Sequence, residues 1–272
     1  MRGASRASLT AAKERLAAAL AGGAAAQASG VGDELFAVVA LLDREPGLRR
    51  SLSDPSRDAG ARVGLAQSVL RGKVSATALE QVAGLAAGRW SEPGDLPDAT
   101  EQLAVLAIAS AADMQGELDE VEDQLFRFSR IVQANPQLRS VLSNQFVPAQ
   151  GRRGVVSQLL EGKVSASALR LITQAAGQPR GRSLDASLES YANLAAELRQ
   201  RLVAEVHVAV PLTDEQRTRL AAALVAAYGH DVHLNVVLDP QVIGGMSVRI
   251  GDELVNGSVA SRLAELRRGL AA

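Results

Sequence analysis

The chain has 272 residues, of which 47% are hydrophobic, 22% charged and 3% aromatic, with a net charge of −1 and no cysteine. Balanced charge gives no electrostatic reason to expect nucleic acid or anionic lipid as a partner, and the lack of cysteine excludes disulfides and thiolate chemistry. The longest uninterrupted apolar run, Leu35–Leu42, is far shorter than the roughly 20 residues that span a bilayer. We therefore expect a soluble cytoplasmic protein of two or three domains, with no direct membrane insertion.

A tandem repeat occupies the first two thirds of the chain. Val31–Leu79 aligns with Val121–Leu169 at a constant offset of 90 residues, and 20 of the 49 aligned positions are identical. A period of 90 residues is too long for a solenoid repeat and matches the size of a small domain. The repeat predicts two copies of one domain, at residues 1–95 (copy one) and 96–202 (copy two).

Both copies have the pattern of amphipathic helices. Apolar residues recur three and four positions apart, which places them on one helix face. Glycine followed by lysine and then a serine two positions later predicts a helix C-cap and the next N-cap at the same place in each copy. The apolar stripes are Val31, Leu35, Val38 and Leu42 in copy one and Leu118, Val121, Leu125, Phe128 and Val132 in copy two, and the caps are Gly72 and Ser75, Gly162 and Ser165.

Copy two closes with a long helix over about 183–203, after which the pattern changes. Val203–Val210 alternates as a strand does, and Pro211 ends it. Thr213 and Gln216 form a capping box that opens a helix to about Tyr228. We therefore expect a mainly α fold: tandem helical bundles followed by a small α/β C-terminal domain, residues 203–272, built as a strand-helix-strand-strand-helix unit.

The last of these elements carry several turn signals in a fixed order. Alternating apolar residues over 234–238 and 246–250 predict two strands, and a serine after Asn256-Gly257 is a natural N-cap for a final helix. None of these residues is an evident nucleophile, metal ligand or phosphate cradle. The turn and cap residues are Asp239, Pro240, Gly244, Gly245, Gly251, Gly257 and Ser258.

This ordered set of residues resembles the C-terminal signature of the ATP synthase delta subunit family, the bacterial counterpart of the mitochondrial oligomycin-sensitivity-conferring protein. Asn256 stands where the family usually has aspartate, a change that leaves the turn chemistry intact. Arg180-Gly181-Arg182 is similar to a Gly-Arg element that the family has before its long helix. The resemblance covers about residues 100–272, and the additional first copy resembles actinobacterial delta subunits.

Other motifs favour structural roles. Gly72-Lys73 and Gly162-Lys163 are similar to the end of a phosphate-binding loop, but they lack its first glycine and its final Ser or Thr. His230 and His233 would face opposite sides of a strand, which disfavours a shared metal ion. The acidic residues over 117–123 fit the solvated start of a helix better than a calcium loop. We predict no catalytic residue, cofactor or metal.

The family resemblance implies a non-catalytic stator subunit of a proton-translocating F1Fo ATP synthase, peripheral to the cytoplasmic face of the cell membrane. It implies two partners: the N-terminal helix of an alpha subunit, received by a helical bundle, and the b subunits of the peripheral stalk, gripped by the C-terminal domain. We predict the alpha-binding groove between the first and fifth helices of copy two. Its expected lining is Leu103, Leu106, Leu169 and Ile172.

Two alternatives stay open on the sequence. These four residues fit the core of the bundle as well as a groove, and the sequence does not decide which copy receives the alpha helix. A helical scaffold that binds amphipathic peptides outside any ATP synthase has the same general pattern. An enzyme with a site in the α/β domain is a third reading, with no catalytic motif to support it.

Overall fold

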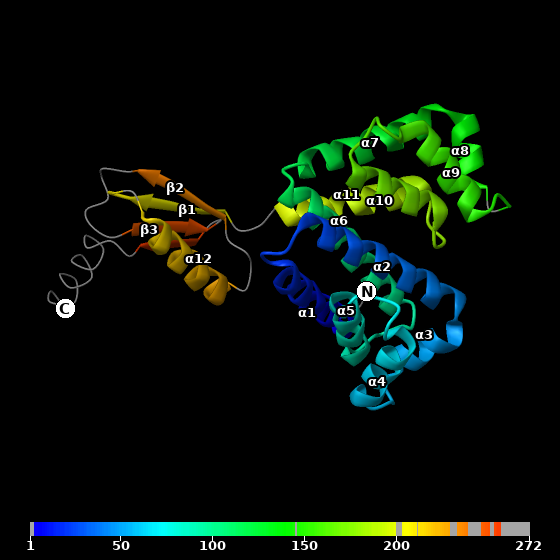
Figure 1. Cartoon of the computed structure of the whole chain (residues 1–272), viewed down its shortest axis with the longest axis horizontal. Helices are drawn as coiled ribbons and strands as arrows, with labels where there is room; N and C mark the ends of the chain where they lie inside the picture. The colour runs from blue at the N-terminus through cyan, green and yellow to red at the C-terminus, as the bar shows by residue number, and fades with distance from the viewer. Residues whose placement is uncertain are drawn as a thin grey trace. The chain divides into compact units, whose positions relative to one another are not determined.

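The computed structural model describes residues 3–144, 146–199, 203–210, 212–228, 233–238, 246–250 and 253–256. The chain forms two compact units, residues 1–198 and residues 199–272 (Figure 1). The described residues are mainly helical, as the sequence predicts. Each unit has its own apolar core.

The first unit contains eleven helices among the residues that the structure describes. Three helices of copy one recur in copy two exactly 90 positions later, with equal lengths, namely α3, α4 and α5 as α8, α9 and α10. The helices are α1 (Gly3–Leu20), α2 (Ala25–Arg44), α3 (Pro46–Ser53), α4 (Ala59–Leu70), α5 (Ala76–Ala87), α6 (Asp95–Met114), α7 (Leu118–Ala134), α8 (Pro136–Ser143), α9 (Ala149–Leu160), α10 (Ala166–Gly177) and α11 (Leu184–Arg199).

Helix α6 has a double place in this repeat. Shifted back by 90 residues it overlaps α1, the first helix of copy one, and shifted forward by 90 it overlaps α11, the last helix of copy two. It is therefore both the sixth helix of copy one and the first helix of copy two. Sixteen of its 20 residues are buried, which agrees with a helix that has neighbours from both copies.

The predicted caps recur in both copies. Gly72 and Gly162 have φ of +73° and +72°, a left-handed conformation that glycine adopts without the steric cost of a Cβ. The hydroxyl oxygens of Ser75 and Ser165 each accept a hydrogen bond from the backbone N–H three residues later, at 3.2 Å. The sequence analysis is confirmed at these four positions, and the same local chemistry ends α4 and α9 and starts α5 and α10.

Helices α2 and α6 pack closely. A Cβ on Gly32 of α2 would lie 2.5 Å from Cγ1 of Ile108 on α6, so only glycine fits there without a shift. Among the described helices, α2 alone is long and apolar enough to cross a membrane. It lies against α6, in a core cluster that includes buried residues of both copies.

The described part of the second unit has one helix and a four-stranded sheet. The strands are ordered β2-β1-β3-β4; β1 pairs parallel with β2 and antiparallel with β3, and β3 pairs antiparallel with β4. The predicted capping box is present, because the N–H of Gln216 donates to Oγ1 of Thr213 at 3.3 Å and the Thr213 N–H donates to Oε1 of Gln216 at 2.9 Å. The elements are β1 (Val203–Val208), α12 (Asp214–Tyr228), β2 (His233–Leu238), β3 (Met246–Ile250) and β4 (Glu253–Asn256).

A small apolar core forms on this sheet from Val206, Val208, Leu224 and Val248. Val206 pairs with Val236 on one side and Val248 on the other, so the three residues form a row across the sheet. The predicted final helix and the turn residues of the C-terminal signature lie outside the described residues. These turn residues are Asp239, Pro240, Gly244, Gly245, Gly251, Gly257 and Ser258.

Candidate partner-binding site

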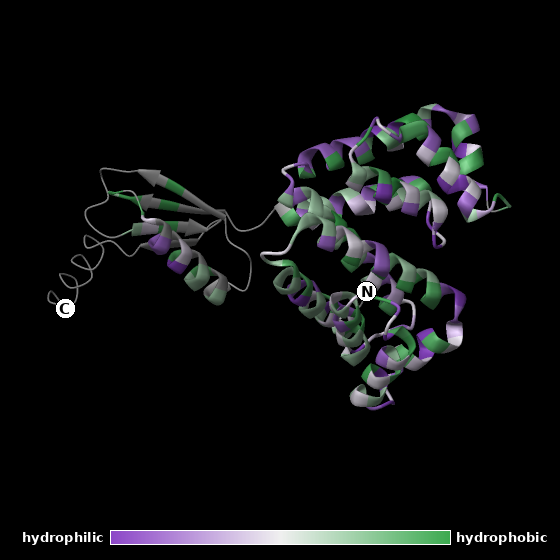
Figure 2. Ribbon diagram, in the orientation of Figure 1, coloured by the Kyte–Doolittle hydropathy of each residue, from purple (hydrophilic) through white to green (hydrophobic). Residues whose placement is uncertain are grey.

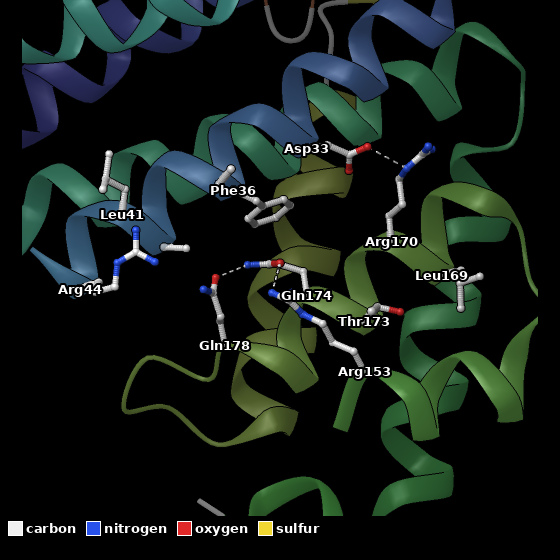
Figure 3. Close-up of a pocket in the computed structure, with 12 residues that line it drawn as sticks. Asp33, Phe36, Leu41, Arg44, Arg153, Leu169, Arg170, Thr173, Gln174 and Gln178 are labelled. Carbon is white, nitrogen blue, oxygen red and sulfur yellow. Dashed lines mark hydrogen bonds and ion pairs between the residues drawn. The ribbon is translucent and has the colours of Figure 1, made fainter. Parts of the chain in front are cut away.

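An open pocket of about 580 Å³ lies between the two copies, with α2 on one side and α9 and α10 on the other (Figure 3). Its wall from copy one is a single face of α2, because the residues involved are spaced three and four apart. The lining residues are Asp33, Phe36, Ala37, Ala40, Leu41 and Arg44 from copy one and Arg153, Leu169, Arg170, Thr173, Gln174 and Gln178 from copy two.

The α2 face of the pocket carries both large and short side chains. Phe36 is 6% exposed, and its ring centroid lies 6.3 Å from that of Tyr191 on α11, in a tilted arrangement. Aromatic pairs at such distances add to the energy of area burial. Ala37 and Ala40 follow on the same face, and their short side chains leave the space open.

Arginine side chains give the pocket a basic wall. Nε of Arg170 lies 3.2 Å from Oδ2 of Asp33, an ion pair that joins α10 to α2. Nη2 of Arg153 donates to Oε1 of Gln174 at 3.3 Å (Figure 3). Gly177 makes room for Arg153, because a Cβ at this position would lie 2.3 Å from the arginine Nε. The opening therefore combines apolar and cationic groups, which suits an amphipathic ligand with acidic residues.

Of the four predicted groove residues, three are buried in the core and one lines the pocket. Leu103 and Ile172 have no exposed surface and Leu106 is 6% exposed, all within the core of the first unit. Leu169 is partly buried and lines the pocket. The sequence analysis missed Phe36 and the arginines, although Phe36 is one of the positions identical between the copies and lies off the apolar stripe of its helix.

A buried polar cluster around Glu101 lies on α6. Its side chain is 5% exposed, and its carboxylate accepts hydrogen bonds from Nη1 of Arg180, Nη2 of Arg182 and the hydroxyl of Tyr191, each at 2.6 Å. Arg180 also donates from Nε to Oδ2 of Asp43 at 2.8 Å. Asp43 is on α2, and the arginines lie in the loop before α11, so this cluster links the two copies through α6.

The electrostatics of the cluster follow from its burial. Burial disfavours the charged form of Arg180, but the hydrogen bond to Asp43 and the charges of Glu101, Asp43 and Asp98 outweigh it and raise the pKa of Arg180. Burial, together with the charge of Glu101, raises the pKa of the Tyr191 hydroxyl well above its ordinary value. Arg180 has a φ of +49°, a left-handed backbone that is strained for a residue with a Cβ. These contacts hold the loop in a strained shape.

The acidic groups of the cluster are paired. Glu101, Asp43 and Asp98 each face an arginine, and Glu101 also accepts a hydrogen bond from the Tyr191 hydroxyl. Within the described ranges, no group of three or more His, Cys, Asp or Glu side chains could hold a metal ion. The described part of the first unit is thus a helical protein with an open pocket lined by apolar, cationic and polar side chains.

Comparison with known proteins identifies the family of this chain. The model of the family described as ATP synthase delta (OSCP) subunit matches residues 104–270. The chain belongs to this family.

Curated relatives named ATP synthase subunit delta match along nearly the whole chain. The Streptomyces avermitilis protein is 48% identical over 269 residues, covering 99% of this chain and 98% of its own. The Thermobifida fusca protein is 45% identical over 271 residues, covering all of both chains. The Kineococcus radiotolerans protein is 43% identical over 269 residues, covering 99% and 97%. The first copy of the repeat is therefore shared with these relatives.

Proposed function

We propose that this chain is the delta subunit of a proton-translocating F1Fo ATP synthase, a non-catalytic part of the peripheral stalk at the cytoplasmic face of the cell membrane. The observation that supports this function is the similarity of 43–48% over nearly the whole chain to proteins named ATP synthase subunit delta. A stator resists the torque of the rotor, so it must be stiff and must release its partners slowly.

The first unit has the properties that such a brace requires. One continuous core extends over both copies, and the cluster around Glu101 ties α2, α6 and the loop before α11 together. Close-packed interiors have low compressibility and transmit strain. A load applied to one copy is therefore passed to the other through α6.

The head contact of this proposal is the N-terminal helix of an alpha subunit. An amphipathic helix lays its apolar face into a groove with anchors three and four residues apart. The pocket between α2 and α10 offers Leu41 and Leu169 to such anchors, beside the buried ring of Phe36, with Arg153 and Arg170 near them. Leu103, Leu106 and Ile172 belong to the buried core of the same bundle.

The stalk contact of this proposal is made by the C-terminal unit. We assign residues 1–95 and 96–202 to the two bundle copies and residues 203–272 to the α/β domain. The exposed ends of the membrane-crossing b subunits are its partners. The parallel pairing of β1 with β2 through the α12 crossover supports an α/β arrangement.

The proposal is tested by purifying the tagged chain from membranes and identifying its partners. We expect the catalytic head and the b subunits to copurify, and the purified chain to lack ATP hydrolysis of its own. Copurification with neither head nor stalk would leave the alternative, a free scaffold for amphipathic peptides. Robust ATP turnover by the isolated chain would instead indicate an enzyme.

A pair of variants locates the head contact. Leu169→Arg removes an apolar contact of the pocket and puts a charged group where an apolar anchor of the helix would lie, so we expect the alpha helix to bind at least about tenfold more weakly, or about 1.4 kcal/mol. Leu79→Arg changes the equivalent residue of copy one and is the matched control. A peptide of the alpha N-terminus, titrated against both variants, gives the affinities. If Leu79→Arg weakened binding by this amount and Leu169→Arg did not, the alpha helix would instead be bound by copy one.

A further inference from the structure

A row of polar side chains from α9 and α10 lines one side of the pocket between the copies. Along these helices hydrophilic residues lie next to hydrophobic ones (Figure 2). Nη2 of Arg153 donates to Oε1 of Gln174 at 3.3 Å, and Nε2 of Gln174 donates to Oε1 of Gln178 at 2.6 Å (Figure 3). Each amide oxygen therefore already accepts a hydrogen bond. We call Arg153, Gln174 and Gln178 the donor row, because Nε and Nη1 of Arg153 and Nε2 of Gln178 have no acceptor in the described part of the chain.

Arg153 is a partly buried cation that lacks a counter-ion. Among the described residues, no carboxylate forms an ion pair with it, whereas Arg170 in the same pocket is paired with Asp33 at 3.2 Å. A charge that is partly withdrawn from water costs free energy unless an opposite charge meets it. An anionic group that entered the pocket would supply this missing partner.

The repeat indicates that the fold does not require the donor row. Copy one forms the equivalent helices, α4 and α5, with lengths equal to those of α9 and α10. Every member of the row, together with the glycine that makes room for Arg153, is a different residue there. In the order Arg153, Gln174, Gly177 and Gln178, the equivalents are Val63, Gly84, Ala87 and Gly88. Copy one therefore reaches the same local fold with no side-chain donor at these positions.

The arginine next to the donor row shows the opposite behaviour. Arg62 and Arg152 occupy equivalent positions in the two copies. Nη2 of Arg62 donates to the carbonyl of Ala87 at 3.4 Å, and Nη2 of Arg152 donates to the carbonyl of Gly177 at 2.9 Å. An arginine that holds the end of a helix is thus present in both copies. The donor row is present in copy two alone, which favours a role in binding a ligand.

We propose that the donor row binds a carboxylate side chain of the helix that enters this pocket. This inference rests on the proposed function, in which that helix is the N-terminus of an alpha subunit. The carboxylate meets the charge of Arg153 and accepts hydrogen bonds from the open donors of the row. Apolar residues of the same helix contact Leu41 and Leu169.

A carboxylate fits the donor row better than a neutral polar group does. An amide or a hydroxyl would offer an acceptor to the row but would leave the charge of Arg153 unmet. Hydrogen bonds from arginine to a carboxylate are roughly twice as strong as those between neutral groups. Asp33 cannot supply this carboxylate at the same time, because it already pairs with Arg170.

The spacing along α10 predicts where the acidic residue of the partner lies. Leu169 and Gln174 are five residues apart on this helix, which is about 8 Å along its axis at about 1.5 Å per residue. A partner helix that lies along the pocket covers the same distance in one to two turns. We therefore expect its acidic residue about one to two turns from the apolar residue that contacts Leu169.

The test uses the full chain and a peptide of the alpha N-terminus from the same organism. Each acidic residue of the peptide is replaced in turn by the corresponding amide, and calorimetric titration gives the affinities. We expect one such amide peptide to bind at least about tenfold more weakly than the unmodified peptide, as for the loss of a hydrogen bond to a charged group. The other amide peptides should bind as the unmodified peptide does.

Two variants locate the carboxylate at the donor row. Gln178→Glu is nearly isosteric and places a negative charge in the row, and Arg153→Gln removes the cation. Each should weaken the unmodified peptide by at least about tenfold and have much less effect on the weakened amide peptide, since that peptide no longer carries the charge. The matched controls are Gln158→Glu on α9 and Arg139→Gln on α8, both at exposed positions outside the pocket lining. Neither control should alter the affinities, and circular dichroism verifies that all four variants fold.

The possible failures separate this inference from the proposed function. Equal binding of all the peptides, or equal losses of the acidic and the amide peptide in both pocket variants, would overturn the carboxylate site and leave the head contact in place. An alpha N-terminus without an acidic residue that nevertheless binds would do the same. No binding of the unmodified peptide by the full chain would overturn the head contact and this inference together.

Discussion

At the scale of single residues, Glu101 is the centre of the buried polar cluster that links the two copies. It is a buried carboxylate, and burial of an ion is costly unless partners satisfy it. Arg180, Arg182 and Tyr191 supply those partners. Arg180 in turn keeps a strained backbone and lies 10% exposed between residues of both copies. The loss of any one member leaves the others buried without a full complement of hydrogen bonds.

Glu101→Gln should therefore lower the free energy of unfolding by about 3–5 kcal/mol, the usual cost of removing one partner from a buried ion pair. Urea denaturation measures the change. Lys13→Ala is the control, because Lys13 pairs with Glu197 at 2.7 Å where both side chains are partly exposed, and such pairs contribute about 0–1 kcal/mol. Equal losses in the two variants would contradict a special role for the cluster.

Tyr191 should make the first unit sensitive to alkali. An unfolded tyrosine loses its proton near pH 10, whereas the native pKa of Tyr191 is raised by burial and by Glu101. Above about pH 10 the unfolded state therefore binds fewer protons than the native state, and stability, complete below that pH, falls as the pH rises.

Parallel titrations of phenolate absorbance and helical circular dichroism measure this dependence. In a Tyr228→Phe background, which leaves Tyr191 as the single tyrosine, we expect phenolate to form together with helix loss. Ionisation of Tyr191 while the helices remain intact would contradict the prediction.

At the scale of elements, the sequence predicts the caps well because their causes are local. Glycine at a left-handed position and serine before a helix need only their immediate neighbours. The capping box at Thr213 is of the same kind. The contact between α2 and copy two could not be predicted in this way, because Phe36 and Arg170 meet only after folding. The available signal was Phe36, which is identical in both copies although it lies off the apolar stripe of its helix.

Glycine substitutions test the local argument in pairs. Gly72→Ala and Gly162→Ala place a Cβ on a left-handed residue, and we expect each to cost about 1 kcal/mol. Gly64→Ala and Gly154→Ala change mid-helix glycines of α4 and α9 with open space around them, so each should stabilise by about 0.5–1 kcal/mol. Thermal unfolding of the four variants gives the signs, and a loss at Gly64 or Gly154 would contradict this explanation.

At the scale of the whole molecule, the tandem bundles share a core. The 90-residue offset predicts two copies, and the mainly helical fold follows from apolar periodicity. The double role of α6 was not predicted. An apolar helix between two copies has the same sequence pattern whether it packs in the bundle of one copy or of both. Its burial on almost every side is the structural evidence that it serves both. For the same reason, Leu103 and Ile172 could not be assigned to core or groove from sequence alone.

The shared core predicts that both copies unfold together. Ile172→Ala in copy two should cost about 2–5 kcal/mol, as for other fully buried aliphatic residues. Trp90 is the single tryptophan of the chain and is buried in copy one, with Nε1 donating to the carbonyl of Leu85 at 2.9 Å. We expect its fluorescence transition in urea to shift by the full cost of the distant substitution. An unchanged tryptophan transition would mean that the copies unfold independently.

The common helix also limits how such a chain can lengthen or shorten. Two bundles of six helices are completed here by eleven helices, since α6 is counted in both. A third bundle added by the same rule would require five new helices and would reuse α11 as its opening member. Conversely, if one bundle is deleted, the bundle that is kept has all six of its helices only when α6 is kept with it.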